Sequence, residues 1–519
     1  MTDYRGLTWD HPRGTVALRR AAAEFSADRS HGDTLTWDSQ PLEGFESHPV
    51  DDLCARYDLV VLDHPHLGDA LATRALQPLG PLVGRDTLAE WSAAAVGASY
   101  ASYEAAGQQW AAPLDAATQV AAANRARLPV LPRTWDEVLT VADRHPVALS
   151  LAGPHALLTF FSLCGALGEP PATTPGPPLV GTGTGLAALE LMDQLVRRGD
   201  PATAGLNPIA LLERLAAEDG PAYCPFVYGY VNYAARHAGS PVRFGDVPRL
   251  TGNGPLGSTL GGTGLAVSRH TAVSGALADH IRDLMSEPVQ RTRFPAYEGQ
   301  PGRREAWLDA GVNEESGGFY AGTLATTEAA WVRPRYPGYT AFQSNASAVL
   351  RDGLLGGRPH RACLSDVLAM HREAVRALPP YDGTRGPPEP PPGAAPPAHL
   401  RQAGCAPPPP PPPLAPPAPP SAPPTPARLP HPRPPTPPPP PPPPPPRLHA
   451  PARRPPLPHT APPPTPPLPM HRLSHPVRSP PTQPPDPPDH CSAGTTHVAT
   501  RRYPNCSAIR VWKSLRDFL

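Results

Sequence analysis

The chain has 519 residues, with 45 basic and 45 acidic side chains, a formal net charge of zero and 84 prolines. These averages hide two parts, because acidic residues predominate in residues 1–386, whereas residues 387–519 are basic and hold most of the prolines. The acidic balance of the first part argues against nucleic-acid binding, and no apolar run reaches the ~20 residues of a membrane-spanning helix. We expect a globular body long enough for two domains, followed by a basic, disordered proline-rich tail.

The amino terminus and the seven cysteines exclude two further classes. Residues 1–10 lack a basic start followed by an apolar stretch, so no secretory signal is expected and the chain as it stands reads as cytoplasmic. The cysteines show neither a C-x-x-C pair nor a zinc-like spacing, so neither a disulfide framework nor a structural metal is expected. The sequence also predicts no cofactor.

The first sixty residues alternate predicted strands with predicted helices. Residues 7–9 and 34–37 read as short strands, and the apolar residues between 16 and 25 follow helical spacing. Residues 57–63 form a continuous apolar run, which is typical of a strand covered on both faces of a parallel sheet. This order predicts a βαβ unit.

The rest of the body reads as further mixed α/β structure. Thr134, followed three positions later by Glu137, predicts a capping box that opens a helix. We read residues 170–183 as a loop rich in proline, glycine and threonine, and we also read the glycine-rich run 181–185 as loop. The other predicted helices are 89–101, 155–167, 185–198, 273–286, 305–311 and 361–377, and the other predicted strands are 222–230 and 265–268.

Candidate binding residues follow the predicted strands, because ligands of open α/β sheets lie beyond the carboxyl ends of strands. They are Trp9, Asp10, His11 and Arg13 after the first strand, and His64 and His66 after the third. Carboxylate, guanidinium and aromatic groups suit the hydroxyl pairs and C–H faces of a sugar. The alternatives are that Asp10 caps the next helix and that Trp9 packs within a lobe. His64 and His66 lack a nearby third ligand, which disfavours a metal site.

A second group of candidates lies later in the chain. Strand alternation places Tyr228, Tyr230 and, if the strand continues, Asn232 on one face. The turn of Gly261, Gly262 and Thr263 lacks the lysine of a phosphate loop, but its amides could meet a ligand oxygen. The remaining candidates are Asp115 as a hydroxyl acceptor and Arg303 and Arg333 as clamps. The alternatives are an ordinary half-buried strand, a tight turn and surface salt bridges.

Five segments of the body form a recognisable series. They are the strand and helix of residues 7–25, YDLVVLDHPHLG at 57–68, QWAAPLD at 109–115, PRTWDEVL at 132–139 and LGGTGLAVS at 260–268. In their order and spacing these segments resemble the extracellular solute-binding proteins of ABC importers, in the carbohydrate-type group known as family 1. The resemblance spans about residues 6–345. It implies a two-lobed α/β fold of the periplasmic-binding-protein type II class, with a hinge and a ligand cleft between the lobes, and no chemistry.

The same resemblance implies lobe boundaries, partners and a location. Lobe 1 would take about residues 1–112 and 258–300, and lobe 2 about residues 116–255 and 301–386. The protein would bind a sugar or related small polar solute, serve membrane permease subunits of an importer, and act outside the cell or at its surface.

Two alternatives remain open. An enzyme or ligand sensor on the same scaffold would use Asp10, His11 and His64 as acid and base, although no nucleophile elbow, phosphate loop or spaced metal set is present. An interaction scaffold would work through the tail, whose proline runs favour polyproline II and fit an SH3-type module. The near absence of Asp, Glu, Val and Gly from the tail favours a different interpretation, in which a shifted reading frame translates cytosine-rich runs as proline.

Overall fold

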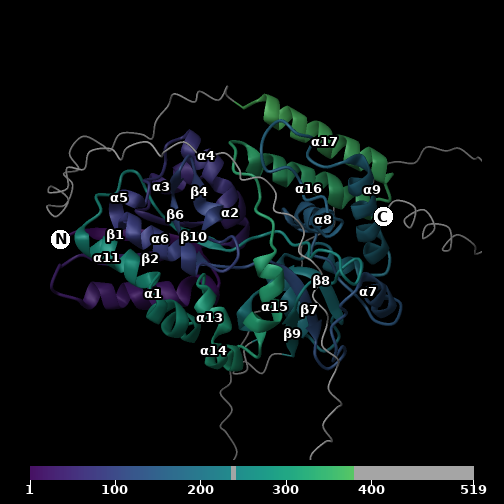
Figure 1. The fold of residues 1–519 in the computed structure, drawn as a ribbon, viewed down its shortest axis with the longest axis horizontal. Helices are drawn as coiled ribbons and strands as arrows, with labels where there is room; N and C mark the ends of the chain where they lie inside the picture. Colours follow the sequence, from purple (N-terminus) through teal and green to yellow (C-terminus); the bar gives the residue numbers. More distant parts are fainter. Residues whose placement is uncertain (235–240, 379–519) are drawn as a thin grey trace, which may run out of the picture. The chain divides into compact units, whose positions relative to one another are not determined.

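Two β-sheets form the centres of two lobes in the computed structural model, which describes residues 1–234 and 241–378 (Figure 1). The five-stranded sheet of lobe 1 has the order β2-β1-β3-β10-β6, and the three-stranded sheet of lobe 2 has the order β8-β7-β9. The expectations for residues 387–519 lie outside the described residues.

The strands of lobe 1 are β1 (Asp3–Trp9), β2 (Thr34–Gln40), β3 (Leu59–Leu62), β6 (Ala111–Asp115) and β10 (Thr263–Val267), with a small ribbon of β4 (Glu104–Ala105) and β5 (Gln108–Gln109). The strands of lobe 2 are β7 (Gln119–Asn124), β8 (Tyr223–Tyr228) and β9 (Val242–Gly245). The predicted strands at 7–9, 34–37, 57–63 and 265–268 are thus confirmed within a few residues at each end.

The sheet of lobe 1 begins as a parallel βαβ unit, as the sequence predicts. β1 pairs in parallel with β2 and with β3, and α1 (Pro12–Ala27) connects β1 to β2. β10 is antiparallel to both β3 and β6, so the sheet is mixed. All four residues of β3 are buried, because alternate side chains enter two hydrophobic cores, one on each face of the sheet.

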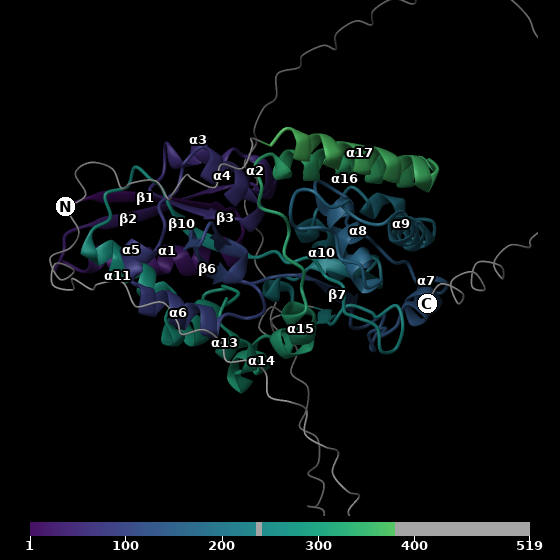
Figure 2. The ribbon, with the colours of Figure 1, turned by 45° about the horizontal axis from the view of Figure 1, so that its top comes forward.

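The helices that cover this sheet lie around it in Figure 2. They are α1, α2 (Leu42–Ser47), α3 (Val50–Cys54), α4 (Leu67–Ala72), α5 (Gly80–Val83), α6 (Arg85–Ala94), α11 (Gly275–Leu284) and α12 (Phe294–Ala296). The helix predicted at 89–101 therefore begins earlier and ends at Ala94. The next residue, Ala95, takes an extended conformation that cannot continue a helix.

The sheet of lobe 2 is also buried on both faces. Ala121, Ala123 and Phe226 pack on one core, and Val120 and Val227 pack on the other. The helices of this part are α7 (Trp135–Ala142), α8 (His155–Ala166), α9 (Thr182–Val196), α10 (Pro208–Ala216), α13 (Arg304–Leu308), α14 (Ala310–Glu315), α15 (Phe319–Glu328), α16 (Tyr339–Leu355) and α17 (His360–Arg376).

The predicted loop at residues 182–185 is wrong, because α9 already begins at Thr182. The Glu169 carboxylate accepts a hydrogen bond from the Gly181 amide at 2.7 Å and another from the Thr184 hydroxyl, and so satisfies the start of the helix. A Cβ atom at Gly185 would lie 2.7 Å from the side chain of Leu364 on α17. The glycine there allows two helices to approach closely and does not mark a loop.

The predicted strand at 222–230 ends at Tyr228, so the proposed alternation from Tyr230 to Asn232 is wrong. Residues Val231–Tyr233 form a 3-10 turn. The Val231 amide donates to the side chain of Gln300 at 3.1 Å instead of to a neighbouring strand. The turn directs Asn232 toward Glu298.

The capping box at the start of α7 is confirmed. The Thr134 hydroxyl accepts from the Glu137 amide, and the Glu137 carboxylate accepts from the Thr134 amide. We expect Thr134→Ala to lower the free energy of unfolding by about 1 kcal/mol, because one amide at the helix start loses its acceptor. Urea denaturation measures this loss, and Thr140→Ala, later in the same helix, serves as the control. Equal stability of Thr134→Ala and the unmodified chain would contradict the expectation.

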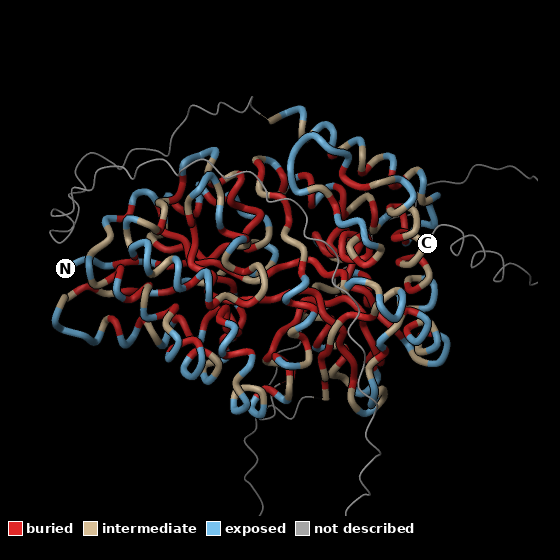
Figure 3. Tube along the Cα trace, viewed as in Figure 1, coloured by how far each residue is buried: buried red, intermediate tan, exposed pale blue. Residues whose placement is uncertain are grey.

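Within the described residues, the chain passes from one lobe to the other between β6 and β7, between β9 and β10 and between α12 and α13. Buried backbone runs through the middle of the molecule in Figure 3. The segment that joins β6 to β7 pairs with the segment before β10, where the Gly261 amide donates to the Ala117 carbonyl at 2.8 Å. A third segment forms a bridge between Pro301 and Asp115. Among the described residues, no helix combines the length and the apolar character needed to cross a bilayer.

Candidate functional site

A cavity of about 60 Å³ lies between the two lobes. Its walls come from the carboxyl ends of β1 and β3, from α2, from the amino-terminal end of α8, from the residues after β8 and from the turn before β10. The lining residues are Trp9, Arg13, Leu42, Phe45, Glu46, Asp63, Pro65, His66, Ala117, Pro154, His155, Leu158, Pro208, Tyr228, Tyr230, Gly261, Gly262, Thr263, Arg333, Thr340 and Gln343.

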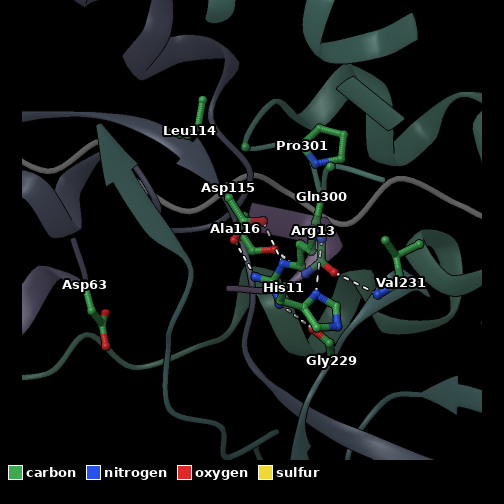
Figure 4. Close-up of polar contacts among 12 residues, drawn as sticks. His11, Arg13, Asp63, Leu114, Asp115, Ala116, Gly229, Val231, Gln300 and Pro301 are labelled. Atoms are coloured by element: carbon green, nitrogen blue, oxygen red, sulfur yellow. Dashed lines mark hydrogen bonds and ion pairs between the residues drawn. The ribbon is translucent and has the colours of Figure 1, made fainter. Parts of the chain in front are cut away.

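Arg13 forms the first of two buried ion pairs at this cavity (Figure 4). Its Nε donates to Asp115 Oδ2 at 2.8 Å, and its Nη2 also pairs with the Asp115 carboxylate. Its Nη1 donates to the carbonyl of Gly229 in lobe 2 at 3.0 Å. Burial alone would lower the pKa of Arg13, but the Asp115 carboxylate more than offsets this and raises it. Arg13 is therefore charged and fixed between the lobes.

Arg333 and Asp63 form the second buried pair. Arg333 Nη2 donates to both Asp63 oxygens, at 2.7 and 2.5 Å, while Nε donates to the Leu260 carbonyl at 3.2 Å. Nη1 donates to Gln343 Oε1 at 3.3 Å. Burial would raise the pKa of Asp63, but the Arg333 guanidinium holds it well below the usual carboxyl range.

Behind this pair lies His64, which is fully buried. Its Nε2 accepts a hydrogen bond from the Arg333 amide at 3.2 Å. Burial, together with the Arg333 charge, lowers the pKa of His64 to about 4 against the opposing effect of Asp63. His64 is therefore neutral near pH 7 and supports the backbone of the segment that carries Arg333.

Several polar atoms at the cavity are buried without a hydrogen-bond partner in the described structure. They include the indole Nε1 of Trp9, the hydroxyl groups of Tyr228 and Thr263 and both ring nitrogens of His155. An unpaired buried polar group costs ~1–3 kcal/mol, and such groups are rare in native proteins. Four side chains with unused hydrogen-bonding capacity thus meet at one cavity, where a polar ligand or bound water can satisfy them together.

Aromatic rings form much of the remaining wall. Trp9 and Phe45 pack with their ring centroids 5.5 Å apart, and the Arg13 guanidinium lies 4.5 Å from the ring centroid of Tyr230. The ring centroids of Tyr228 and His155 lie 5.7 Å apart. Together the rings offer apolar faces beside the unpaired donors and acceptors, a combination that suits the C–H faces of a polyhydroxylated molecule.

Both glycines of the turn before β10 are required by close packing. Gly262 has φ of 88°, and a Cβ atom there would lie 2.4 Å from the Asp115 carbonyl oxygen. A Cβ atom at Gly261 would lie 2.5 Å from the ring of Tyr228. These close contacts hold the connecting segments together. Gly261 and Gly262 therefore form a tight turn, which was the alternative interpretation of their sequence.

The structure brings nine of the fifteen predicted residues to the cavity. These are Trp9, Arg13, His66, Tyr228, Tyr230, Gly261, Gly262, Thr263 and Arg333. Asp115 and His64 lie behind it and hold Arg13 and the Arg333 backbone, respectively.

The other four make different contacts. Asp10 is exposed and accepts from Ser39, while His11 packs on Tyr230 and accepts from the Arg13 amide as the cap of α1. The alternative that Asp10 caps this helix is therefore wrong. Asn232 contacts Glu298.

Arg303 lies within an arginine–carboxylate cluster outside the cavity lining, where it pairs with Glu90 and Glu305. The sequence-based alternative of a salt-bridging role describes this contact, although Arg303 itself is buried and not at the surface.

Sequence reasoning missed Asp63, Phe45, Glu46, His155 and Gln343. Asp63 directly follows β3, so the rule about strand ends could have identified it. The others lie on α2, α8 and α16, and no local pattern indicates that these helices meet at one cavity.

A possible metal cluster lies elsewhere, on α9 and α17. Its members are Glu190, Asp193 and His360. The two nitrogens of His360 face different carboxylates, with Nδ1 3.7 Å from Glu190 and Nε2 3.6 Å from Asp193, and Asp193 also pairs with Arg197. His360 therefore bridges α9 and α17, and the Asp193 carboxylate already has a cationic partner in Arg197.

Comparison with known proteins identifies the fold. No family model matches the chain, and no curated protein matches it. The maltose-bound MalE3 protein of T. maritima superposes with a TM-score of 0.60 at 15% identity, covering 72% of this chain and 99% of that one. A solute-binding protein of an ABC transporter from Agrobacterium radiobacter K84, in complex with ribitol, gives 0.59 at 19% identity, covering 72% and 98%.

A third structure, a solute-binding protein from Agrobacterium vitis S4 with bound D-mannitol, gives a TM-score of 0.58 at 15% identity, with coverage of 72% and 99%. At these identities the likeness shows the fold alone. The predicted two-lobed fold class is confirmed, and the resemblance drawn from the sequence motifs is confirmed at the level of the fold.

Proposed function

We propose that this protein binds a sugar, a polyol or a related small polar solute between its lobes, as the substrate-binding component of an ABC-type importer. The observation that carries the proposal is the set of unpaired buried polar atoms at the cavity, on Trp9, Thr263, Tyr228 and His155. A hydroxyl group both donates and accepts, so a polyhydroxylated ligand can satisfy all of them. The fold of proteins that hold maltose, ribitol and D-mannitol supports the same role.

The cavity chemistry also favours binding over catalysis. The enzyme alternative depended on Asp10, His11 and His64, but Asp10 is exposed, His11 caps α1 and His64 supports the Arg333 segment. Burial, followed by the charge of Arg13, lowers the pKa of His11 to about 4, so it is a poor general base near neutral pH. The two aspartates at the cavity are already occupied by arginines.

The proposal is tested by thermal unfolding of the full chain with maltose, ribitol, D-mannitol, glucose and small carboxylates. A ligand at ~100 times its dissociation constant adds ~2.7 kcal/mol to the stability, which raises the melting temperature by several degrees. A shift with a sugar or polyol that is recovered unchanged supports binding. Consumption of that compound favours an enzyme, and the lack of a shift with every sugar and polyol contradicts the proposal.

Removal of one unpaired hydroxyl group gives a sharper version of this test. We expect Tyr228→Phe to weaken binding of the identified ligand about fivefold, the equivalent of about 1 kcal/mol, because the ring stays while one hydrogen bond is lost. Tyr233→Phe is the matched control, since the Tyr233 hydroxyl donates to Glu213 outside the cavity lining. Isothermal titration measures both, and equal affinities in the two variants would contradict a role for Tyr228.

A further inference from the structure

The charges at the cavity are balanced except at one residue. Arg13 is neutralised by Asp115 and Arg333 by Asp63, each through a two-point contact. His66 lines the cavity as a buried ring whose pKa is lowered by burial, so it adds no charge near neutral pH. The charged and titratable side chains that remain at the lining are Glu46 and His155.

Glu46 has no arginine partner of its own. It lies on α2 with 18% of its side chain exposed, and its contact is with His155, whose Nε2 lies 3.2 Å from Glu46 Oε1. Neither nitrogen of the buried His155 ring makes a hydrogen bond of acceptable geometry. Glu46 therefore places a carboxylate at the cavity without the arginine that each of the two aspartates has.

Aromatic faces adjoin this carboxylate. Phe45 precedes Glu46 and packs on Trp9, while Tyr228 contacts the same His155 ring that faces Glu46. The faces of Trp9 and Tyr230 already attract the Arg13 guanidinium, at 5.8 and 4.5 Å. Ring faces combined with a carboxylate that no arginine pairs are the groups that proteins use to recognise an ammonium ion.

We propose that this cavity selects a polyhydroxylated ligand that carries an ammonium group, such as an amino sugar or an amino polyol, with the ammonium group paired to Glu46. The inference rests on the proposed function and narrows its ligand class. The unpaired donors and acceptors on Trp9, Thr263 and Tyr228 take the hydroxyl groups, as they would for a neutral sugar. An acidic sugar is disfavoured, because its carboxylate finds both arginines already paired.

The test compares sugars that differ in one group. The full chain is titrated with glucose, glucosamine and glucuronate and with galactose, galactosamine and galacturonate. All titrations use one buffer at about pH 7, where the ammonium groups of 2-amino sugars, which titrate close to the range of α-amino groups, are mostly charged. We expect the amine of a matched set to bind about tenfold more tightly than the neutral sugar, and the acid to bind more weakly than both.

Glu46→Gln is expected to remove the advantage of the amino sugar over the neutral sugar of the same set, because the ratio of the two affinities cancels any change that the variant makes to the affinity for both sugars. Asp52→Asn on α3 removes one exposed carboxylate from the same lobe outside the cavity lining and serves as the charge-matched control. Circular dichroism and melting temperature confirm that both variants are folded.

Three outcomes overturn the inference. The neutral sugar can bind as tightly as the amine, Glu46→Gln can weaken both equally, or Asp52→Asn can reduce the preference as much as Glu46→Gln does. In each case a sugar still binds, so the proposed function stands while the ligand class fails. If no sugar or polyol of any charge binds, the proposed function itself fails.

Discussion

Replacing Arg333 with leucine is expected to lower the free energy of unfolding by about 3–5 kcal/mol, because it leaves a buried carboxylate without a countercharge. Asp63 is paired with Arg333 through both oxygens, and 16% of its side chain is exposed against 2% for Arg333. The same change removes the donors to the Leu260 carbonyl and to Gln343. Urea denaturation of the full chain, followed by circular dichroism, measures the loss.

Three further variants separate the buried charge from other effects, namely Arg304→Leu, Asp63→Leu and the double variant of Asp63 and Arg333. Arg304→Leu breaks the exposed pair with Glu328 at 2.7 Å and is expected to cost no more than about 1 kcal/mol. Adding Asp63→Leu to Arg333→Leu removes the stranded carboxylate and is expected to recover part of the stability. If the double variant is as unstable as the sum of the two single variants, the loss comes from packing and not from the unpaired charge.

Acidification is expected to destabilise the protein strongly between about pH 6.5 and pH 4. Burial is the main reason that the pKa values of His11, His64 and His280 fall to about 4, whereas an unfolded histidine titrates near 6.5. In this range the unfolded chain binds protons that the folded chain does not. The stability conferred by these neutral histidines is therefore complete above about pH 6.5, falls as the pH falls, and reaches its lower limit below about pH 4.

His64 is the clearest contributor, since it is fully buried and its Nε2 accepts a hydrogen bond that a protonated ring could not accept. The lowered pKa of His64 contributes at most about 3 kcal/mol to the free energy of unfolding. Below about pH 4 the free energy of unfolding falls further. The pKa of Asp63 is lower in the folded chain than in the unfolded chain, so acid protonates its carboxylate in the unfolded chain at a higher pH.

The measurement is the unfolding free energy from urea titrations at several pH values. We expect His64→Gln to flatten the dependence between about pH 6.5 and pH 4, while His270→Gln, at an exposed position, keeps it. The same slope in His64→Gln and in the unmodified chain would show that His64 does not carry this dependence.

Strand ends proved the most informative feature of the sequence. The rule that ligands lie beyond carboxyl ends placed Trp9, Arg13 and His66 at the cavity, and it would have placed Asp63 there as well. The same reasoning could not assign Asp10, His11 or His64 correctly. The side chains of neighbouring residues after a strand point in different directions, and the rule does not distinguish between them. Only the turn geometry decides which of them lines the cavity and which caps a helix or supports another segment.

The elements that were not predicted have weak local patterns. β7 has the sequence QVAAAN, and alanine favours helices over strands. It is a strand because it lies between β8 and β9 and is buried on both faces. Glu46 and His155 likewise meet only in the folded chain, since α2 and α8 belong to different lobes and lie far apart in sequence.

The size of the cavity has a consequence for the time course of ligand capture. About 60 Å³ corresponds to only a few water molecules. We therefore expect a hexose to enter only after the contacts of Arg13 with Gly229 and of Glu46 with His155 separate. At high ligand concentration the observed association rate should level off at the rate of this separation. The apparent dissociation constant would then equal the intrinsic constant divided by the fraction of molecules in which these contacts are separated. It rises as that fraction falls. Stopped-flow tryptophan fluorescence would show this plateau, and Arg13→Lys, which shortens the reach across the lobes, should raise it.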